Sequence, residues 1–400
     1  MQDLHIKLKY VIVLSVLTVV CCTEPFDIPK TKTEGILVVD ARITNENKQQ
    51  VVRLSRTVPL DSNAINGEAQ AQVLVSDDLG NEFRFNESES GTYLSDANFA
   101  VVPGRVYELK VETSDGWSYS SQRTQAPPAA RIDRLYAEKG IRDSLEQGVF
   151  IYVDNDEPAN GPFYYKYEYE ETYKVFAPYW VPEEAYLVNF DPTISGAVPT
   201  DVRPKMQEEQ VCYPSVKSKR IIQGNTAGLT GNSLEKFPVR FVAQSNYILA
   251  YHYTILVRQY VQSPQAYTYY ETLAKLSSVE NVFSQIQTGF FEGNITSDVD
   301  VLEPVLGYFE VASVDEQRIF FDYGDIFPGE RRPNFPFLCE FQAPLRGLRS
   351  AIEFEILEFY DYNDPPDPQY SEPGPYIMVP RVCGDCTVLG SNVIPDFWTE

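Results

Sequence analysis

Alternating hydrophobic and polar positions in the first third of the chain predict short β-strands. Residues 36–43 are rich in β-branched side chains, and the odd positions of 107–111 are apolar between charged neighbours, the period-2 pattern of a half-buried strand. Segments 78–81 (Asp-Leu-Gly-Asn) and 114–116 (Ser-Asp-Gly) separate strand-like runs as hairpin turns do. This pattern predicts an immunoglobulin-like β-sandwich over residues 35–126.

The rest of the chain also shows mainly strand patterns. Aromatic residues alternate with polar ones in 163–170, which places Phe163 and every second residue after it in the core. The alternation in 352–356 predicts another strand, and the nearly continuous apolar run 247–257 predicts a central strand covered on both faces. One helix is expected from 263, where Ser-Pro supplies a cap and a first helical residue before an apolar stripe.

A Pro- and Ala-rich stretch at 124–130 interrupts the strand pattern and predicts a domain boundary. The fold class that follows is all-β. We expect the sandwich to be followed, over residues 131–400, by a larger β-rich domain with one or two helices.

The first 21 residues have the pattern of an export signal. A basic start precedes an apolar run that is too short to span a bilayer, and the run ends at Cys21-Cys22. This ending resembles a lipobox, in which a small residue precedes the lipidated cysteine. We therefore predict lipidation of Cys22 and a tether over residues 22–34; the alternative is a plain secretory signal with incidental cysteines.

Charge and composition exclude some functions. The 400-residue chain carries 57 acidic and 33 basic side chains, a formal charge of −24, which disfavours nucleic-acid binding. Its only histidines are His5 and His252, too few for most His-ligated zinc sites or His relays. We interpret His252 as a structural residue on a strand, because no nucleophile is identifiable beside it.

Four cysteines remain after the lipidation site: Cys212, Cys339, Cys383 and Cys386. Outside the cytoplasm an even count favours disulfides, and four cysteines allow three connectivities. A bridge from Cys212 or Cys339 to the C-terminal pair would close a long loop and hold the C-terminal tail. A redox motif at Cys383-Gly-Asp-Cys386 and a four-cysteine zinc site are the alternatives.

Acidic loops and aromatic side chains are the other candidates for chemistry. The clusters at 154–157 and 361–367 favour solvated loops over calcium sites, and paired carboxylates are too numerous here to indicate glycoside hydrolysis. Phe176, Tyr179 and Trp180 lie in an irregular, Tyr-rich segment, and such side chains often form recognition surfaces. We predict ligand contact at these three residues, and no catalytic residue, cofactor or metal.

Several stretches carry a family resemblance that follows the order of the chain. They are 22–26, 35–44, 164–173, 212–213, 293–295, 304–309, 318–320, 383–386 and 395–398. With them the chain resembles the Bacteroidota outer-membrane lipoprotein family catalogued as domain of unknown function 4249. The resemblance implies a lipoprotein that faces the cell surface or the periplasm, and it implies no catalytic residues.

Together these observations predict a protein anchored to the outer membrane through its lipid. The first hypothesis is a non-catalytic binding or accessory component that works with a TonB-dependent receptor in nutrient uptake. The alternatives are an envelope hydrolase that uses carboxylates and a structural envelope lipoprotein.

Overall fold

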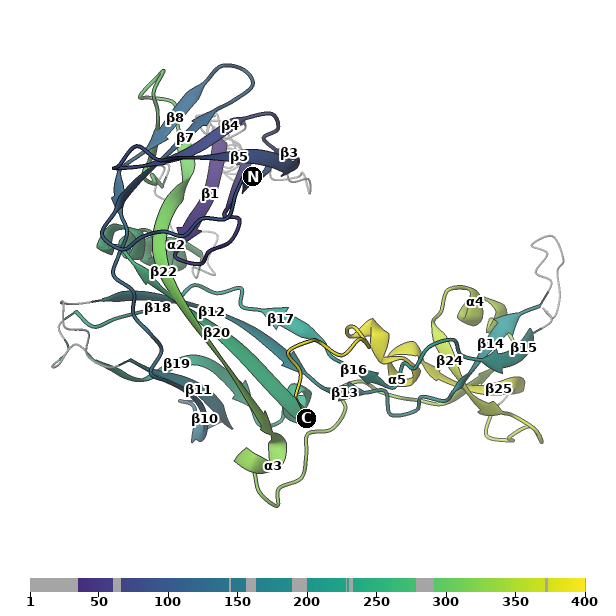
Figure 1. The fold of residues 1–400 in the computed structure, drawn as a ribbon. Helices are drawn as coiled ribbons and strands as arrows, with labels where there is room; N and C mark the ends of the chain where they lie inside the picture. Colours follow the sequence, from purple (N-terminus) through teal and green to yellow (C-terminus); the bar gives the residue numbers. More distant parts are fainter. Residues whose placement is uncertain are drawn as a thin grey trace, which may run out of the picture.

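The computed structural model describes residues 35–59, 66–143, 145–155, 163–188, 200–227, 229, 233–277, 291–370 and 373–399. The protein is mostly β, with 49% strand and 11% helix, and contains one large mixed sheet and several small sheets. Figure 1 shows three parts, which we name the N-terminal unit, the central body and the arm. The arm projects to one side of the central body.

The N-terminal unit is a continuous ladder of short strands, which includes β21 and the first half of β22 from later in the chain. Its strands are β1 (Leu37–Thr44), β2 (Val51–Arg56), β3 (Asn66–Gly67), β4 (Gln72–Asp77), β5 (Glu82–Glu89), β6 (Thr92–Ser95), β7 (Val106–Glu112), β8 (Ser118–Ser121), β9 (Thr124–Gln125), β21 (Ile295–Ser297) and β22 (Val305–Asp322).

Both predicted hairpins of this unit are confirmed. Antiparallel β4 and β5 are joined through 78–81, and β7 and β8 through 113–117. The odd positions of β7 are buried in the core of the unit together with Tyr93 and Phe309. Local turn chemistry and period-2 burial therefore determine these hairpins.

The ladder returns on itself where β21 lies beside β22. The Asn294 side chain donates to the carbonyl oxygen of Phe309 at 2.9 Å and accepts from its N–H at 2.8 Å. This amide replaces a strand partner for both backbone groups of a buried residue. Beside it Gly293 approaches Gly307 so closely that a Cβ would collide with the Gly307 carbonyl.

Strand β22 belongs to two units. Its first half pairs in parallel with β1, from Leu37–Val305 to Thr44–Ala312. Its second half pairs antiparallel with β20 (His252–Gln262), from Ser313 to Asp322. The N-terminal unit and the central body are thus joined by one uninterrupted 18-residue strand, visible as the long arrow in Figure 1.

The central body consists of two facing sheets around an aromatic core. One is the part of the large sheet formed by β17, β12, β20 and β22, with β18; the other is the three-stranded sheet β10-β11-β19. Their new elements are β10 (Arg134–Ile141), β11 (Gln147–Asn155), β12 (Tyr164–Tyr173), β17 (Ser215–Lys217), β18 (Ile222–Asn225), β19 (Leu234–Ala243), a 3-10 turn (Tyr247–Leu249) and α3 (Tyr323–Ile326). As predicted, Phe163, Tyr165 and Tyr167 are buried in this core, and Tyr169 is half-buried against it.

The predicted helix is confirmed as α2 (Pro264–Ser277), and the Ser263 hydroxyl caps it by accepting from the Ala266 N–H at 3.1 Å. The predicted central strand is confirmed only from His252, and its expected start at 247 is wrong. Residues 247–249 form the 3-10 turn instead, because the Asn246 side chain accepts from the Ile248 N–H and caps it.

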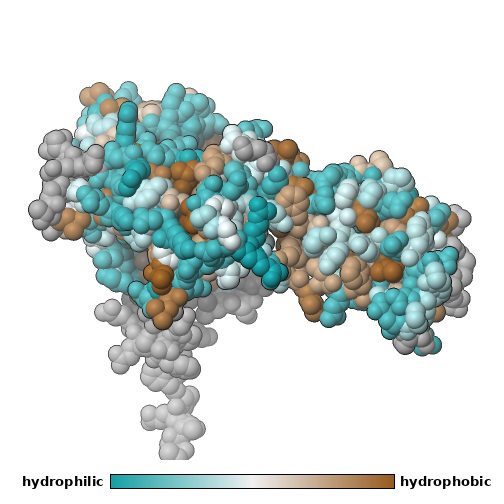
Figure 2. All heavy atoms as spheres, turned by 90° about the horizontal axis from the view of Figure 1, so that it is seen from below, coloured by the Kyte–Doolittle hydropathy of each residue, from teal (hydrophilic) through white to brown (hydrophobic). Residues whose placement is uncertain are grey.

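The arm is built from short pieces of chain taken from two distant segments. Its elements are β13 (Val175–Phe176), β14 (Glu183–Leu187), β15 (Thr200–Pro204), β16 (Val211–Cys212), β23 (Gln342–Pro344), α4 (Leu348–Glu353), β24 (Leu357–Tyr362), β25 (Pro373–Pro380), α5 (Arg381–Gly384) and a 3-10 turn (Cys386–Val388). The chain then returns to the central body, where Trp398 packs on Tyr213 and His252. Figure 2 shows hydrophilic side chains over much of the central body and more hydrophobic ones where it meets the arm.

The strand predicted over 352–356 is wrong. Leu348 and Ala351 have helical spacing, and in α4 they bury one face of the helix in the arm. Phe354 and Ile356, which the alternation placed in a core, are 69% and 56% exposed.

Candidate functional site

The best-built polar site lies at the junction between the N-terminal unit and the central body. Strands β1, β22, β20 and β12 lie side by side here, and α2 contacts β12 and β20. The apolar residues of β1 face the core of the N-terminal unit, so Arg42 faces the other side of the sheet. In the parallel register Arg42 is the direct partner of Glu310 on β22.

Glu310 is the centre of a buried ion cluster. Its side chain is fully buried, and its Oε2 atom lies 2.7 Å from Arg42 Nε and 3.1 Å from Lys166 Nζ. The Gln262 amide donates to the other carboxylate oxygen. Arg42 also forms an ion pair with Glu168, whose Oε1 atom lies 2.9 Å from the Arg42 guanidinium. All the ionised atoms of Glu310 therefore have partners, as burial requires.

The charges of the cluster support one another. Burial alone would raise the pKa of Glu310, but Lys166, Arg42 and the Gln262 hydrogen bond overcome it and lower the pKa to about 2. Burial lowers the pKa of Lys166, and Glu310 opposes that shift. Glu310 is thus ionised across the physiological range of pH and holds two cations in fixed positions.

Tyrosine rings complete the surroundings of both cations. The Arg42 guanidinium lies 4.3 Å from the centre of the Tyr260 ring, and Lys166 Nζ lies 3.7 Å from that of Tyr270 on α2. Such contacts stabilise a desolvated cation by about 2 kcal/mol. Helix α2 therefore contributes directly to the cluster through Tyr270.

An open cleft of about 460 Å³ adjoins this cluster, and we name it the junction cleft. It is within the size range of small-molecule sites. Its lining comprises Asp40, Arg42, Lys166, Tyr167, Glu168, Tyr169, Glu170, Lys217, Ser218, Lys219, Arg220, Ile221, Leu256, Arg258, Tyr270 and Leu273. Six of these side chains are cations and three are carboxylates, the reverse of the balance in the whole chain.

The sequence pattern alone did not reveal this site, although it contains one signal of it. Glu310 is a single carboxylate within the apolar run 308–312, and a buried carboxylate needs a cation. The alternation in 163–170 places Lys166 on the face opposite the core tyrosines, the face that such a pattern usually leaves towards solvent. Lys166 is buried instead, because α2 contacts β12 and places Tyr270 against the ammonium group.

The three aromatic residues predicted to contact a ligand lie elsewhere, where the arm leaves the central body. Phe176 packs on Tyr251, and Tyr179 packs on Phe341 and Tyr360. Trp180 is half-buried against the aromatic core. None of the three lines the junction cleft. Their contact with a ligand stays a prediction.

His252 lies at the start of β20 and is largely buried. Its Nδ1 atom is 2.7 Å from Asp322 Oδ1, and its ring lies between Phe320 and Trp398. These contacts agree with the structural role that we favoured for it.

The four cysteines form two disulfides, Cys212–Cys386 and Cys339–Cys383. Disulfides were expected, but the sequence left three connectivities open; the structure has the one in which each bridge joins an earlier segment to the C-terminal pair. In the described part of the arm, a separate hydrophobic cluster has four buried members, Leu348, Phe359, Tyr376 and Met378. So small a cluster benefits from covalent links.

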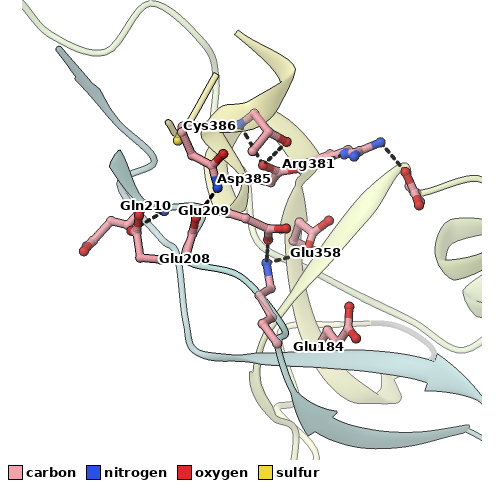
Figure 3. Close-up of polar contacts among 12 residues, drawn as sticks. Glu184, Glu208, Glu209, Gln210, Glu358, Arg381, Asp385 and Cys386 are labelled. Atoms are coloured by element: carbon pink, nitrogen blue, oxygen red, sulfur yellow. Dashed lines mark hydrogen bonds and ion pairs between the residues drawn. The ribbon is translucent and has the colours of Figure 1, made fainter. Parts of the chain in front are cut away.

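A second polar cluster fixes the C-terminal segment within the arm. Glu209 and Glu358 converge on the Lys205 ammonium at 2.7 and 3.0 Å, and Asp385 accepts from Arg381 at 3.0 Å (Figure 3). The Cys386 N–H donates to the Glu209 carbonyl at 2.9 Å. Burial raises the pKa of Glu358, which Lys205 only partly offsets. Because these groups satisfy one another, the cluster explains how the arm is held together.

Two features bear on the membrane. Cys22, the predicted lipidation site, lies outside the described residues. Among the helices of the described ranges, none is long and apolar enough to cross a bilayer.

The fold and the junction cleft together define a mostly β protein with a cation-lined cleft between two units that share a strand. The family model described as domain of unknown function (DUF4249) matches residues 23–318, and the chain belongs to this family. The matched segment contains every residue that lines the junction cleft. No curated protein matches the chain.

Proposed function

We propose that the protein is a non-catalytic binding or accessory component of the outer membrane, tethered through Cys22, that works with a TonB-dependent receptor in nutrient uptake. The lipoprotein and Bacteroidota attributions are part of this proposal and are supported by the signal-like first 21 residues and the family resemblance. The immunoglobulin-like character of residues 35–126 is also part of this proposal. The antiparallel strands of that segment support it.

The observation that carries the proposal is the junction cleft. Replacement of a buried ion cluster by well-packed hydrophobic side chains of the same volume is often neutral or stabilising, so a gain in stability does not by itself explain such a cluster. Here the cluster of Arg42, Lys166 and Glu310 lies against an open cavity of small-molecule size. Fixed charges beside a cavity are what a ligand site needs, because they orient a polar ligand without first having to reorganise.

The test is an affinity pull-down of the full-length lipidated protein from detergent-solubilised outer membranes, followed by mass spectrometry. We expect one TonB-dependent receptor in near-equal amount. A matched bait that carries Cys22→Ser should recover less of it, since the unlipidated chain is not held at the membrane. Recovery of no stable partner with the lipidated bait would overturn the accessory role.

A further inference from the structure

We infer that the junction cleft binds an oxyanion-bearing small molecule, whose carboxylate, sulfate or phosphate group lies against Lys219 and Arg220. The inference deepens the proposed function and rests on it only in taking the cleft as a ligand site. It follows from the charges around the cleft, and the arms of the experiment distinguish the three anion chemistries.

Among the described residues, some cations of the cleft have no ion-pair partner. Arg42 and Lys166 are committed to Glu310, and Arg258 pairs with Glu316 at 2.8 Å. Lys217, Lys219 and Arg220 are exposed, and within the described ranges they form no ion pair. This excess is unusual in a chain with a formal charge of −24.

The carboxylates of the cleft already have cationic neighbours. Glu168 pairs with Arg42 at 2.9 Å, and Asp40 lies 4.0 Å from Arg53. Glu170 is the cross-strand register partner of Lys217. Of the three exposed cations, Lys217 therefore lies beside a carboxylate on the neighbouring strand, and Lys219 and Arg220 are the two that we assign to an incoming anion.

The segment that carries these cations is fixed to the sheet. The Ser218 N–H donates to the Tyr169 carbonyl at 2.8 Å, and its hydroxyl accepts from the Tyr169 N–H at 3.1 Å. Two hydrogen bonds to β12 thus hold the backbone immediately before Lys219 and Arg220. A held backbone reduces the entropy lost when their side chains engage a ligand.

The experiment is calorimetric titration of the full-length lipidated protein in detergent with three probes. Trigalacturonate presents carboxylates, a heparin-derived disaccharide presents sulfates, and inorganic pyrophosphate presents phosphates; maltotriose is the neutral control. We expect at least one anionic probe to bind with a Kd below about 1 mM, more weakly as salt is raised, and maltotriose not to bind.

Variants place the binding in the cleft. The double variant K219E/R220E, which changes two exposed side chains, should lower the affinity for the probe at least about tenfold, or about 1.4 kcal/mol. Lys110→Glu is the matched control, since Lys110 is an exposed lysine on β7 outside the cleft, and it should change affinity less than about twofold. Thermal unfolding of each variant checks that the fold is intact.

Two results would overturn the inference: binding of none of the three anions, or binding that K219E/R220E leaves unchanged. Its failure is distinguishable from that of the accessory role. If the receptor is recovered but no anion binds, the anion site is rejected and the accessory role stands. If an anion binds but no receptor is recovered, the accessory role is rejected and the anion site stands.

Discussion

Lys166 and Glu310 lie on β12 and β22 with β20 between them, and their charged atoms meet at 3.1 Å between two buried side chains. The side chains are 4% and 0% exposed. The pair, together with Arg42, ties three strands of the junction to one carboxylate.

Glu310→Gln should destabilise the protein strongly. It leaves Arg42 and Lys166 without their shared anion in a desolvated site, which costs about 3–5 kcal/mol. Glu316→Gln, on the same strand but in a half-exposed pair with Arg258, should cost less than about 1 kcal/mol. Urea unfolding at neutral pH measures both, and equal losses would contradict a special role for the buried pair.

Stability should fall between about pH 5 and pH 2 in a way that depends on Glu310. Its pKa is about 2 in the folded protein against an ordinary value of 4.5, so the unfolded chain binds the proton first. The ionised Glu310 therefore adds to the free energy of unfolding at pH values above its pKa in the unfolded chain. This stabilisation, on the order of 3 kcal/mol, is lost as the pH falls towards its pKa in the folded protein. Unfolding measured from pH 7 to pH 2.5 should show a shallower fall in Glu310→Gln than in the wild type.

Gly307→Ala should disrupt the start of β22. Gly307 has φ +100°, and a Cβ there would collide with the backbone of Val39 on β1. We expect a loss of more than about 3 kcal/mol. Gly80→Ala is the matched control, since φ is +83° there with open space around it, and should cost about 1–2 kcal/mol. Comparable thermal shifts would mean that the close approach is unimportant.

The two disulfides give a peptide map that can be checked directly. A digest of the unreduced protein should contain Cys212 linked to Cys386 and Cys339 linked to Cys383, with no free thiol among the four. Removal of the first bridge by C212S/C386S should destabilise the protein by roughly 2–5 kcal/mol. A peptide in which Cys383 and Cys386 are linked to each other by a disulfide would contradict this pairing.

The proposed lipidation distinguishes the two adjacent cysteines at the end of the signal-like segment. Cys22→Ser should abolish fatty-acid labelling of the protein in its host. Cys21→Ser should keep it, because serine is also a small residue before the acceptor. Continued labelling of Cys22→Ser would place the acceptor at Cys21 or elsewhere.

The sequence predicted the features that depend on neighbouring residues. Turn residues at 78–81, the Ser263-Pro264 start of α2 and the buried tyrosines of 163–170 were all found because local chemistry determines them. The helix over 348–353 was missed because its short apolar stripe overlaps a period-2 pattern in 352–356. A six-residue helix leaves too few turns for a clear period.

The junction could not be predicted, because it depends on contacts between distant segments. Arg42 and Glu310 are 268 residues apart, and nothing local indicates that β1 and β22 pair in parallel. The lone carboxylate within 308–312 shows that a cation must be nearby, but not which one.

The shared strand β22 has a mechanical consequence. Two domains joined by a flexible linker can rotate independently. A force applied to one domain therefore extends the linker before it acts on the other domain. Here the connection is a strand hydrogen-bonded along its length, first to β1 and then to β20. Tension applied at the N-terminus would load β1 and β22 in shear across many hydrogen bonds at once. The central body would therefore keep its orientation relative to the N-terminal unit under load.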